Sequence, residues 1–265
     1  MPYNTTGQSH AEGVQCEKEI ARLLNIAAIR NPLGFGRHYE DIPQFIHQGG
    51  TQAVEDIQLK NQDGEVVDGI SVKQHKTGTC DFINTSRLES FLPASVVTLL
   101  RETIAEIRSN HRGDATQIDH VRKLLKSITN SVFQSINSNN IRDLLKAIHE
   151  RNPLWFLIKD VANNRLLNYK HSQLTELAES PYVDENNYSL AAPRGATGSR
   201  RILCNGQDTG LRLRVALNNG VKALLDVGGG RNHNSSWTLK VQWDGIDDFI
   251  ETTQPYGEYS YESSE

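Results

Sequence analysis

Two alternating runs on either side of a five-residue turn constrain the fold more than any other feature of the chain. They extend from Ala53 to Lys60 and from Val66 to Lys76, and Asp63-Gly64 supplies the turn. Apolar and polar residues alternate in both: Ile57 and Leu59 with Asp56 and Gln58, then Ile70 and Val72 with Ser71 and Lys73. Because successive strand side chains point to opposite faces, the pattern predicts a β-hairpin with one polar face.

Helical periodicity flanks this hairpin. Residues Ala11 to Asn25 predict an amphipathic helix that carries Glu17 in the same stripe as its apolar residues. Three further helices are expected from Thr85 to Arg108, from His120 to Ser135 and from Asn140 to Glu150. Residues 34–50, rich in Gly, Pro and His, are typical of a loop that leads toward the sheet.

The C-terminal third has the pattern of short strands. Leu154 to Asp160 predicts a buried strand followed by irregular polar sequence, and from Arg200 onward four alternating runs end at Gly, Asn or Asp turns. One of these runs is Val221 to Val227. We therefore expect an α/β or α+β fold, with a mixed central sheet flanked by helices. Residues 1–185 would form a core with a helical insertion at about 86–150, and residues 186–265 a β-rich region with an acidic tail.

Composition narrows the class of protein. A chain of 265 residues can bury a sizeable core without crosslinks, and its three widely spaced cysteines do not suggest disulfides or a zinc site. The sequence starts with no secretory signal, and no stretch approaches the roughly 20 apolar residues that cross a bilayer. These features predict a cytoplasmic protein.

The net charge of −4 hides an uneven distribution along the chain. Residues 189–240 contain eight Lys and Arg but only two acidic residues, whereas residues 244–265 contain seven Asp and Glu and no Lys or Arg. The basic segment suits nucleic acid. The acidic tail is expected to solvate the chain end, or alternatively to shield the basic surface.

The polar face of the hairpin carries the residue types that phosphodiester hydrolysis needs. The reaction uses carboxylates to hold a hard metal ion, and a cation near the attacked phosphate. Antiparallel pairing through the turn would bring Asp56 level with Ser71 to Lys73. Glu17, on the preceding helix, could add a second carboxylate. A hairpin whose polar face is simply solvated is the alternative.

The order helix, acid strand, hairpin, lysine strand and helix resembles the PD-(D/E)XK nuclease superfamily, and within it type II restriction endonucleases. The resemblance covers about residues 10–105. It implies that Asp56 is the first metal-binding acid, that Lys73 orients the attacking water, and that the backbone carbonyl of Val72 binds Mg²⁺. It also implies a homodimer that cuts double-stranded DNA at a short specific sequence, and a companion DNA methyltransferase.

The second acid of that family pattern is replaced here by Ser71. Three substitutes are open. Ser71 could hold a metal-bound water, Glu17 could supply the carboxylate, or Gln74 and Lys76 could form the Q-x-K pattern of some superfamily members.

Candidate DNA-binding residues lie at the end of the hairpin and in the basic segment. Lys76 and Arg87 could reach phosphates, and Arg212 and Arg214 would share one strand face. The remaining candidates are Arg200 and Arg201, and then Arg231, Asn232 and Asn234 in the Gly-rich loop 228–236, where Arg and Asn suit base edges. This region loosely resembles GGCC-type cutters, although a β module for protein contact is the alternative.

The sequence leaves two alternatives to a restriction endonuclease open. One is a modification-dependent, repair or junction nuclease, and the other is a DNA-binding defence protein without catalysis.

Overall fold

The computed structural model describes residues 6–35, 44–48, 55–75, 80–85, 88–151, 155–174, 180–192, 198–228 and 235–261. These residues form a mixed α and β structure, as expected, in two compact units. Unit 1 contains Met1–Cys80, Ala147–Ser180 and Gly245–Glu265, and unit 2 contains Asp81–Lys146 and Pro181–Asp244. The chain passes between the units several times, so most of the helical segment groups with the C-terminal strands. One division, between Ser180 and Pro181, lies close to the expected boundary near residue 185, but residues 81–146 group with unit 2 and residues 245–265 with unit 1.

Unit 1 is built on a sheet of six strands in the order β1-β2-β3-β5-β6-β11. The strands are β1 (Gln44–His47), β2 (Ile57–Lys60), β3 (Val66–His75), β5 (Trp155–Asp160), β6 (Arg165–Lys170) and β11 (Gly257–Ser260). Neighbours are antiparallel except β3 and β5, which are parallel with Ser71 beside Phe156. Parallel neighbours need a long crossover, and this one contains the three helices at 94–111, 118–135 and 138–151.

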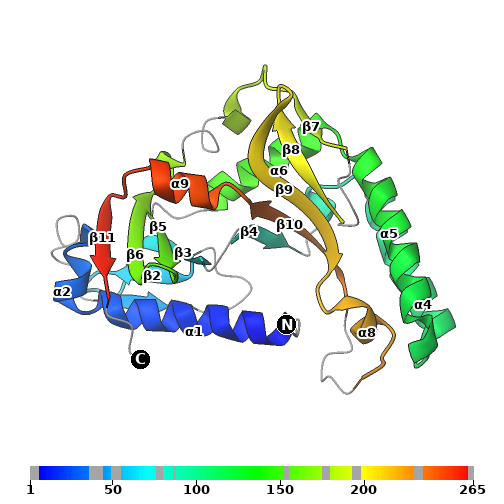
Figure 1. The fold of residues 1–265 in the computed structure, drawn as a ribbon, viewed down its shortest axis with the longest axis horizontal. Coiled ribbons are helices and arrows are strands. Elements are labelled where there is room, and N and C mark those ends of the chain that lie inside the picture. The colour runs from blue at the N-terminus through cyan, green and yellow to red at the C-terminus, as the bar shows by residue number, and fades with distance from the viewer. Residues whose placement is uncertain are drawn as a thin grey trace. The chain divides into compact units, whose positions relative to one another are not determined.

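Helix α1 (Thr6–Leu24) covers one face of this sheet (Figure 1). Ile20 and Leu24 pack there against Ile57 and Ile70, and all four side chains are fully enclosed. Burial of each such side chain stabilises the fold by roughly 1.5–3 kcal/mol. The predicted first helix and the apolar face of the hairpin are therefore confirmed. The short helix α2 (Ala27–Arg30) follows, and the one-turn 3₁₀ helix η3 (His171–Gln173) follows β6.

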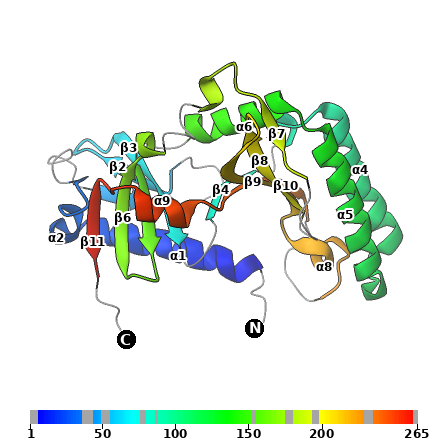
Figure 2. The ribbon, with the colours of Figure 1, turned by 45° about the horizontal axis from the view of Figure 1, so that its top comes forward.

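Unit 2 has a sheet of five strands in the order β4-β10-β9-β8-β7. The strands are β4 (Cys80–Thr85), β7 (Tyr188–Leu190), β8 (Ser199–Cys204), β9 (Gln207–Leu217) and β10 (Trp237–Trp243), and the helices are α4 (Ala94–His111), α5 (Ile118–Ser135), α6 (Ser138–Arg151) and α8 (Gly220–Leu224). Short 3₁₀ turns are η1 (Leu88–Ser90), η2 (Ala115–Gln117) and η4 (Ser180–Tyr182). Helices α4 and α5 lie side by side (Figures 1 and 2). The Trp237 indole donates a hydrogen bond of 2.8 Å to the Leu100 carbonyl, which ties β10 to α4.

The acidic C-terminal segment is not a solvated tail, contrary to expectation. It forms helix α9 (Ile246–Thr252) and then β11, which pairs with β6 at the edge of the unit 1 sheet (Figure 2). Two of its carboxylates have partners in unit 1: Asp247 contacts His75, and Glu258 contacts Arg165. The segment therefore completes the first sheet.

Four smaller expectations were wrong. Strand β1 lies within the expected loop. Strand β6 follows β5 where irregular sequence was expected. It was missed because it buries consecutive residues and therefore shows no alternation of apolar and polar residues. The expected strand from Val221 instead contains helix α8, since a short apolar run does not separate helix from strand. The helix expected from Thr85 begins only at Ala94, directly after Pro93, and Thr85 ends β4. The other two predicted helices are confirmed as α5 and α6.

Candidate active site and basic sheet face

The β2–β3 hairpin forms because its turn satisfies its own backbone. The Asn61 side-chain oxygen accepts hydrogen bonds from the backbone N–H groups of Asp63 (3.0 Å) and Glu65 (2.9 Å). Gly64 has a φ of 81°, a left-handed conformation that favours glycine. The resulting register pairs Ile57 with Ile70, which sets Asp56 opposite Ser71 one step further on.

Asp56 lies against the backbone of the lysine strand, as the sequence predicted. Its Oδ2 accepts a hydrogen bond of 2.6 Å from the Val72 N–H and a longer one of 3.4 Å from the Ser71 hydroxyl. The N–H and C=O of one strand residue point to the same strand edge. The Val72 carbonyl therefore points to the edge where the Asp56 carboxylate lies.

Ser71, Lys73 and His75 share the face of β3 that points away from α1. Ser71 and His75 are buried and Lys73 is partly exposed, so this polar face is not simply solvated. His75 Nε2 lies 2.8 Å from the Asp247 carboxylate of α9. Within the described ranges, Lys73 forms no ion pair.

Glu17 lies at the same end of the sheet but on the other face. Its carboxylate contacts His47 Nε2 at 2.9 Å, and His47 pairs with Ile57 in the β1–β2 ladder. The Asp56 backbone carbonyl accepts a hydrogen bond from the Gln48 N–H at this same end. The structure thus brings Glu17 near the Asp56 strand end through His47, not into the contact between Asp56 and β3.

Gln74 also lies on the α1 face, where it pairs in register with Lys159 of β5. Lys159 Nζ contacts Glu19 of α1 at 2.7 Å, an acid–lysine pair that the sequence reasoning missed. Burial lowers the pKa of Lys159, but the Glu19 hydrogen bond and charge outweigh that effect and raise the pKa, so the amine stays protonated. Such a pair leaves no local sequence signal, because its members are far apart in the chain.

The donor set at Asp56 fits a hard cation with few protein ligands. Mg²⁺ is commonly held by one or two carboxylates and completes its shell with water. The Asp56 carboxylate and the Val72 carbonyl would supply the nearest oxygens, with Glu17 as a further carboxylate at that sheet end. No group of three His, Cys, Asp or Glu side chains gathers as a metal site in the residues that the structure describes.

The basic segment forms one face of the unit 2 sheet, which we call the outer face. It presents side chains from three neighbouring strands: Arg201 of β8, Arg212 and Arg214 of β9, and Lys240 and Gln242 of β10. On β9, Leu211, Leu213 and Val215 are buried on the opposite face, so the predicted shared face of Arg212 and Arg214 is confirmed. Arg214 is exposed.

Arg200 differs from the other arginines. It pairs with Leu213 and is buried, with its guanidinium donating to the Asn130 side chain at 2.7 Å and lying 4.8 Å from the centre of the Phe133 ring. Asn130 and Phe133 belong to α5. The contacts of Arg200 therefore tie β8 to a helix, in contrast to the expected contact with DNA.

Five sequence-predicted residues lie outside the described residues: Lys76, Arg87, Arg231, Asn232 and Asn234. No described helix combines the length and hydropathy of a membrane-spanning segment. No protein-family model, curated protein or solved structure matches this chain.

Proposed function

We propose that this protein is a Mg²⁺-dependent endonuclease that hydrolyses phosphodiester bonds of double-stranded DNA at a short specific sequence, in the manner of type II restriction enzymes. The observation that carries the proposal is the contact of the Asp56 carboxylate with the Ser71-Val72 backbone, with Lys73 next along the strand. This contact joins an acid strand to a lysine strand through a short hairpin that follows a helix. The PD-(D/E)XK pattern has the same order of elements. In this protein a further strand, β5, then lies parallel to the lysine strand β3.

Each residue has a distinct role in the proposed reaction. Asp56 and the Val72 carbonyl would hold Mg²⁺, and Glu17 would join them only by leaving its contact with His47 on the other face of the sheet. When bound, the ion would neutralise phosphate charge and lower the pKa of a bound water. Lys73, on the same strand face as buried Ser71, would place its ammonium group beside the attacked phosphate and orient the attacking water. Ser71 takes the position of the second acid and can contribute only a neutral hydroxyl.

The outer face of unit 2 supports DNA as the polymer. Arg201, Arg212, Arg214 and Lys240 present four cations across three strands, and each phosphate contact of this kind adds salt-dependent affinity. A homodimer and a companion methyltransferase belong to this proposal, since palindromic sites are read by two-fold enzymes.

The proposal is tested by incubating purified protein with plasmid DNA prepared with and without base methylation, in Mg²⁺ and in EDTA. We expect discrete fragments from unmethylated DNA in Mg²⁺ only. Cleavage of methylated DNA alone would replace the proposal with a modification-dependent nuclease.

One observation favours a different class of function. Ser71 removes a carboxylate from the site, which would suit a protein that binds DNA without cutting it. Plasmid that is bound in a mobility-shift assay but remains uncut across a range of Mg²⁺ and salt concentrations would establish that alternative.

A further inference from the structure

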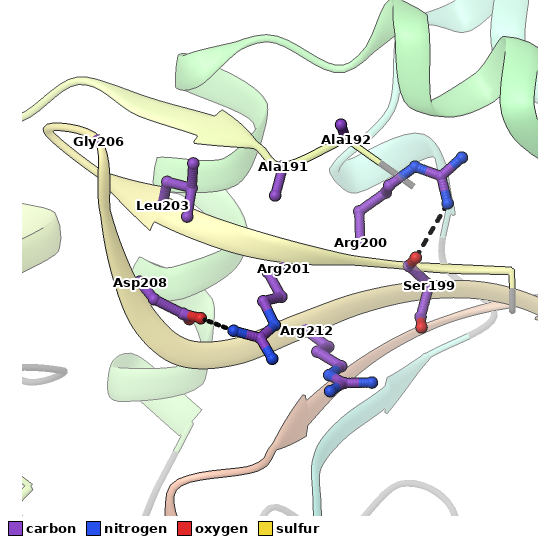
Figure 3. A pocket seen from close by; sticks show the side chains of 9 residues that line it. All are labelled: Ala191, Ala192, Ser199, Arg200, Arg201, Leu203, Gly206, Asp208 and Arg212. Atoms are coloured by element: carbon purple, nitrogen blue, oxygen red, sulfur yellow. Dashed lines mark hydrogen bonds and ion pairs between the residues drawn. The ribbon is translucent and has the colours of Figure 1, made fainter. Parts of the chain in front are cut away.

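A pocket opens on the outer face of unit 2 beside two opposed arginines (Figure 3). Arg201 of β8 and Arg212 of β9 are directly paired across the antiparallel ladder. Like charges in such a pair are destabilising, so the arrangement needs compensation. Asp208 forms an ion pair with Arg201, and Asp244 forms one with Arg212.

These two carboxylates cannot satisfy both arginines completely. A guanidinium has five N–H donors, and one carboxylate accepts at most a bidentate pair of them. The ion pairs therefore fix the orientation of both guanidiniums and leave further donors for another acceptor. An anion between Arg201 and Arg212 would relieve their mutual repulsion and use those donors.

On the side of the pocket away from the two arginines, the lining side chains are apolar and mostly small. Figure 3 shows Ala191, Ala192 and Leu203 on the β7 side, and Asp208, Arg201 and Arg212 on the β9 side. The pocket has a volume of about 350 Å³, within the range of small-molecule sites. Arg200 also borders it, but its guanidinium turns away toward α5 and leaves the charged side to the other two arginines.

We propose that this pocket binds one nucleotide unit, with the phosphate between Arg201 and Arg212 and the base against Ala191, Ala192 and Leu203. The paired guanidiniums match phosphate oxygens, and the apolar side matches a flat ring. Asp208 accepts hydrogen bonds only and repels a second anion, so it favours a ligand that carries amino or hydroxyl donors. The proposal concerns binding alone and holds whether or not unit 1 cuts DNA.

The nucleotide unit has two possible sources. It could be a free nucleoside monophosphate, or one nucleotide of a DNA strand. A base stacked inside a duplex cannot enter such a pocket, so the strand would have to present a single-stranded end or a base turned out of the stack.

The test measures binding in EDTA, so that hydrolysis does not contribute. Deoxynucleoside monophosphates, inorganic phosphate and a short fluorescent single strand are titrated separately against the wild-type protein, Arg212→Ala and Arg122→Ala. Arg122 is the matched control, because it is an exposed arginine of the same unit, on α5, that does not border the pocket. We expect Arg212→Ala to weaken monophosphate or strand binding at least tenfold, and Arg122→Ala to change the binding of either probe less than twofold.

A second variant, Ala192→Phe, fills the apolar side at an exposed position that tolerates a larger side chain. It should weaken nucleotide binding and leave phosphate binding unchanged, and its unfolding midpoint checks that it folds. Binding of monophosphates supports the free source, and binding of the strand alone supports the strand source. Equal losses in Arg212→Ala and Arg122→Ala, phosphate bound as tightly as nucleotide, or no binding of either the monophosphates or the strand would overturn the proposal.

Discussion

Replacement of Asp56 by asparagine separates the carboxylate's structural role from its proposed role as a metal ligand. The side chain keeps its size, and its remaining oxygen can still accept the hydrogen bond from the Val72 N–H, which is 2.6 Å long in the wild type. A hydrogen bond to a charged group contributes about 1.5–3 kcal/mol, and a neutral one about 0.5–1.5 kcal/mol. Asp56→Asn should therefore lower the free energy of unfolding by about 1 kcal/mol without Mg²⁺.

The free energies of unfolding of the wild type and Asp56→Asn should then differ further when Mg²⁺ is added. A ligand that binds only the folded state at ten times its dissociation constant stabilises that state by about 1.4 kcal/mol. Wild-type protein should gain this amount, whereas the asparagine variant should gain little because an amide is a poor ligand for a hard cation.

Urea unfolding in EDTA and across a Mg²⁺ titration measures both effects. Asp63→Asn is the matched control, since Asp63 is exposed in the turn of the same hairpin and should retain the full Mg²⁺ gain. Asp56 does not hold Mg²⁺ if Asp56→Asn is stabilised by Mg²⁺ as much as the wild type, or if the wild type gains no stability from Mg²⁺.

Two further predictions concern stability in unit 1. Gly257→Ala would place a methyl group within 2.6 Å of the Leu33 backbone, which cannot rotate away, so we expect urea unfolding to show a loss of at least about 2 kcal/mol. Gly13→Ala in α1 meets nothing within 4 Å and should instead stabilise by about 0.5–1 kcal/mol, and equal effects of the two changes would contradict this contrast. Burial, followed by the charge of His171, lowers the pKa of His149 from 6.5 to about 4. Below pH 6.5 the unfolded chain therefore binds more protons at this position, and stability should fall by about 1 kcal/mol between pH 7 and pH 5 after allowance for solvent screening. His149→Gln should flatten that slope in urea unfolding, and an unchanged slope would show that another group titrates.

The hairpin and its Asp56 contact were predictable because their signals are local. Alternation places Ile57 and Ile70 on one face, and the Asn61 to Glu65 turn fixes the register. Once the register is fixed, the proximity of Asp56 to Ser71 follows from geometry alone. The helices α5 and α6 were predictable for the same reason, since each carries its own apolar stripe.

The environment of the hairpin was not predictable, because it depends on contacts between distant parts of the sequence. Asp247 reaches His75 only because the acidic segment returns to the first sheet, which its charge count does not indicate. Glu17 contacts His47 of β1. This contact was not predictable, because β1 lies in a stretch whose composition is typical of a loop. Arg200 faces inward because strand alternation, not charge, decides its direction.

Single-turnover cleavage of plasmid DNA by Lys73→Met measures whether Lys73 acts in phosphodiester hydrolysis. Lys60→Met is the matched control, since Lys60 is a partly exposed lysine on the other strand of the same hairpin, at its turn end. We expect Lys73→Met to cleave at least about a hundredfold more slowly at unchanged DNA affinity, with Lys60→Met within twofold of the wild type. If Lys73→Met cleaves as fast as Lys60→Met, then Lys73 does not act in the reaction and the proposed active site is wrong.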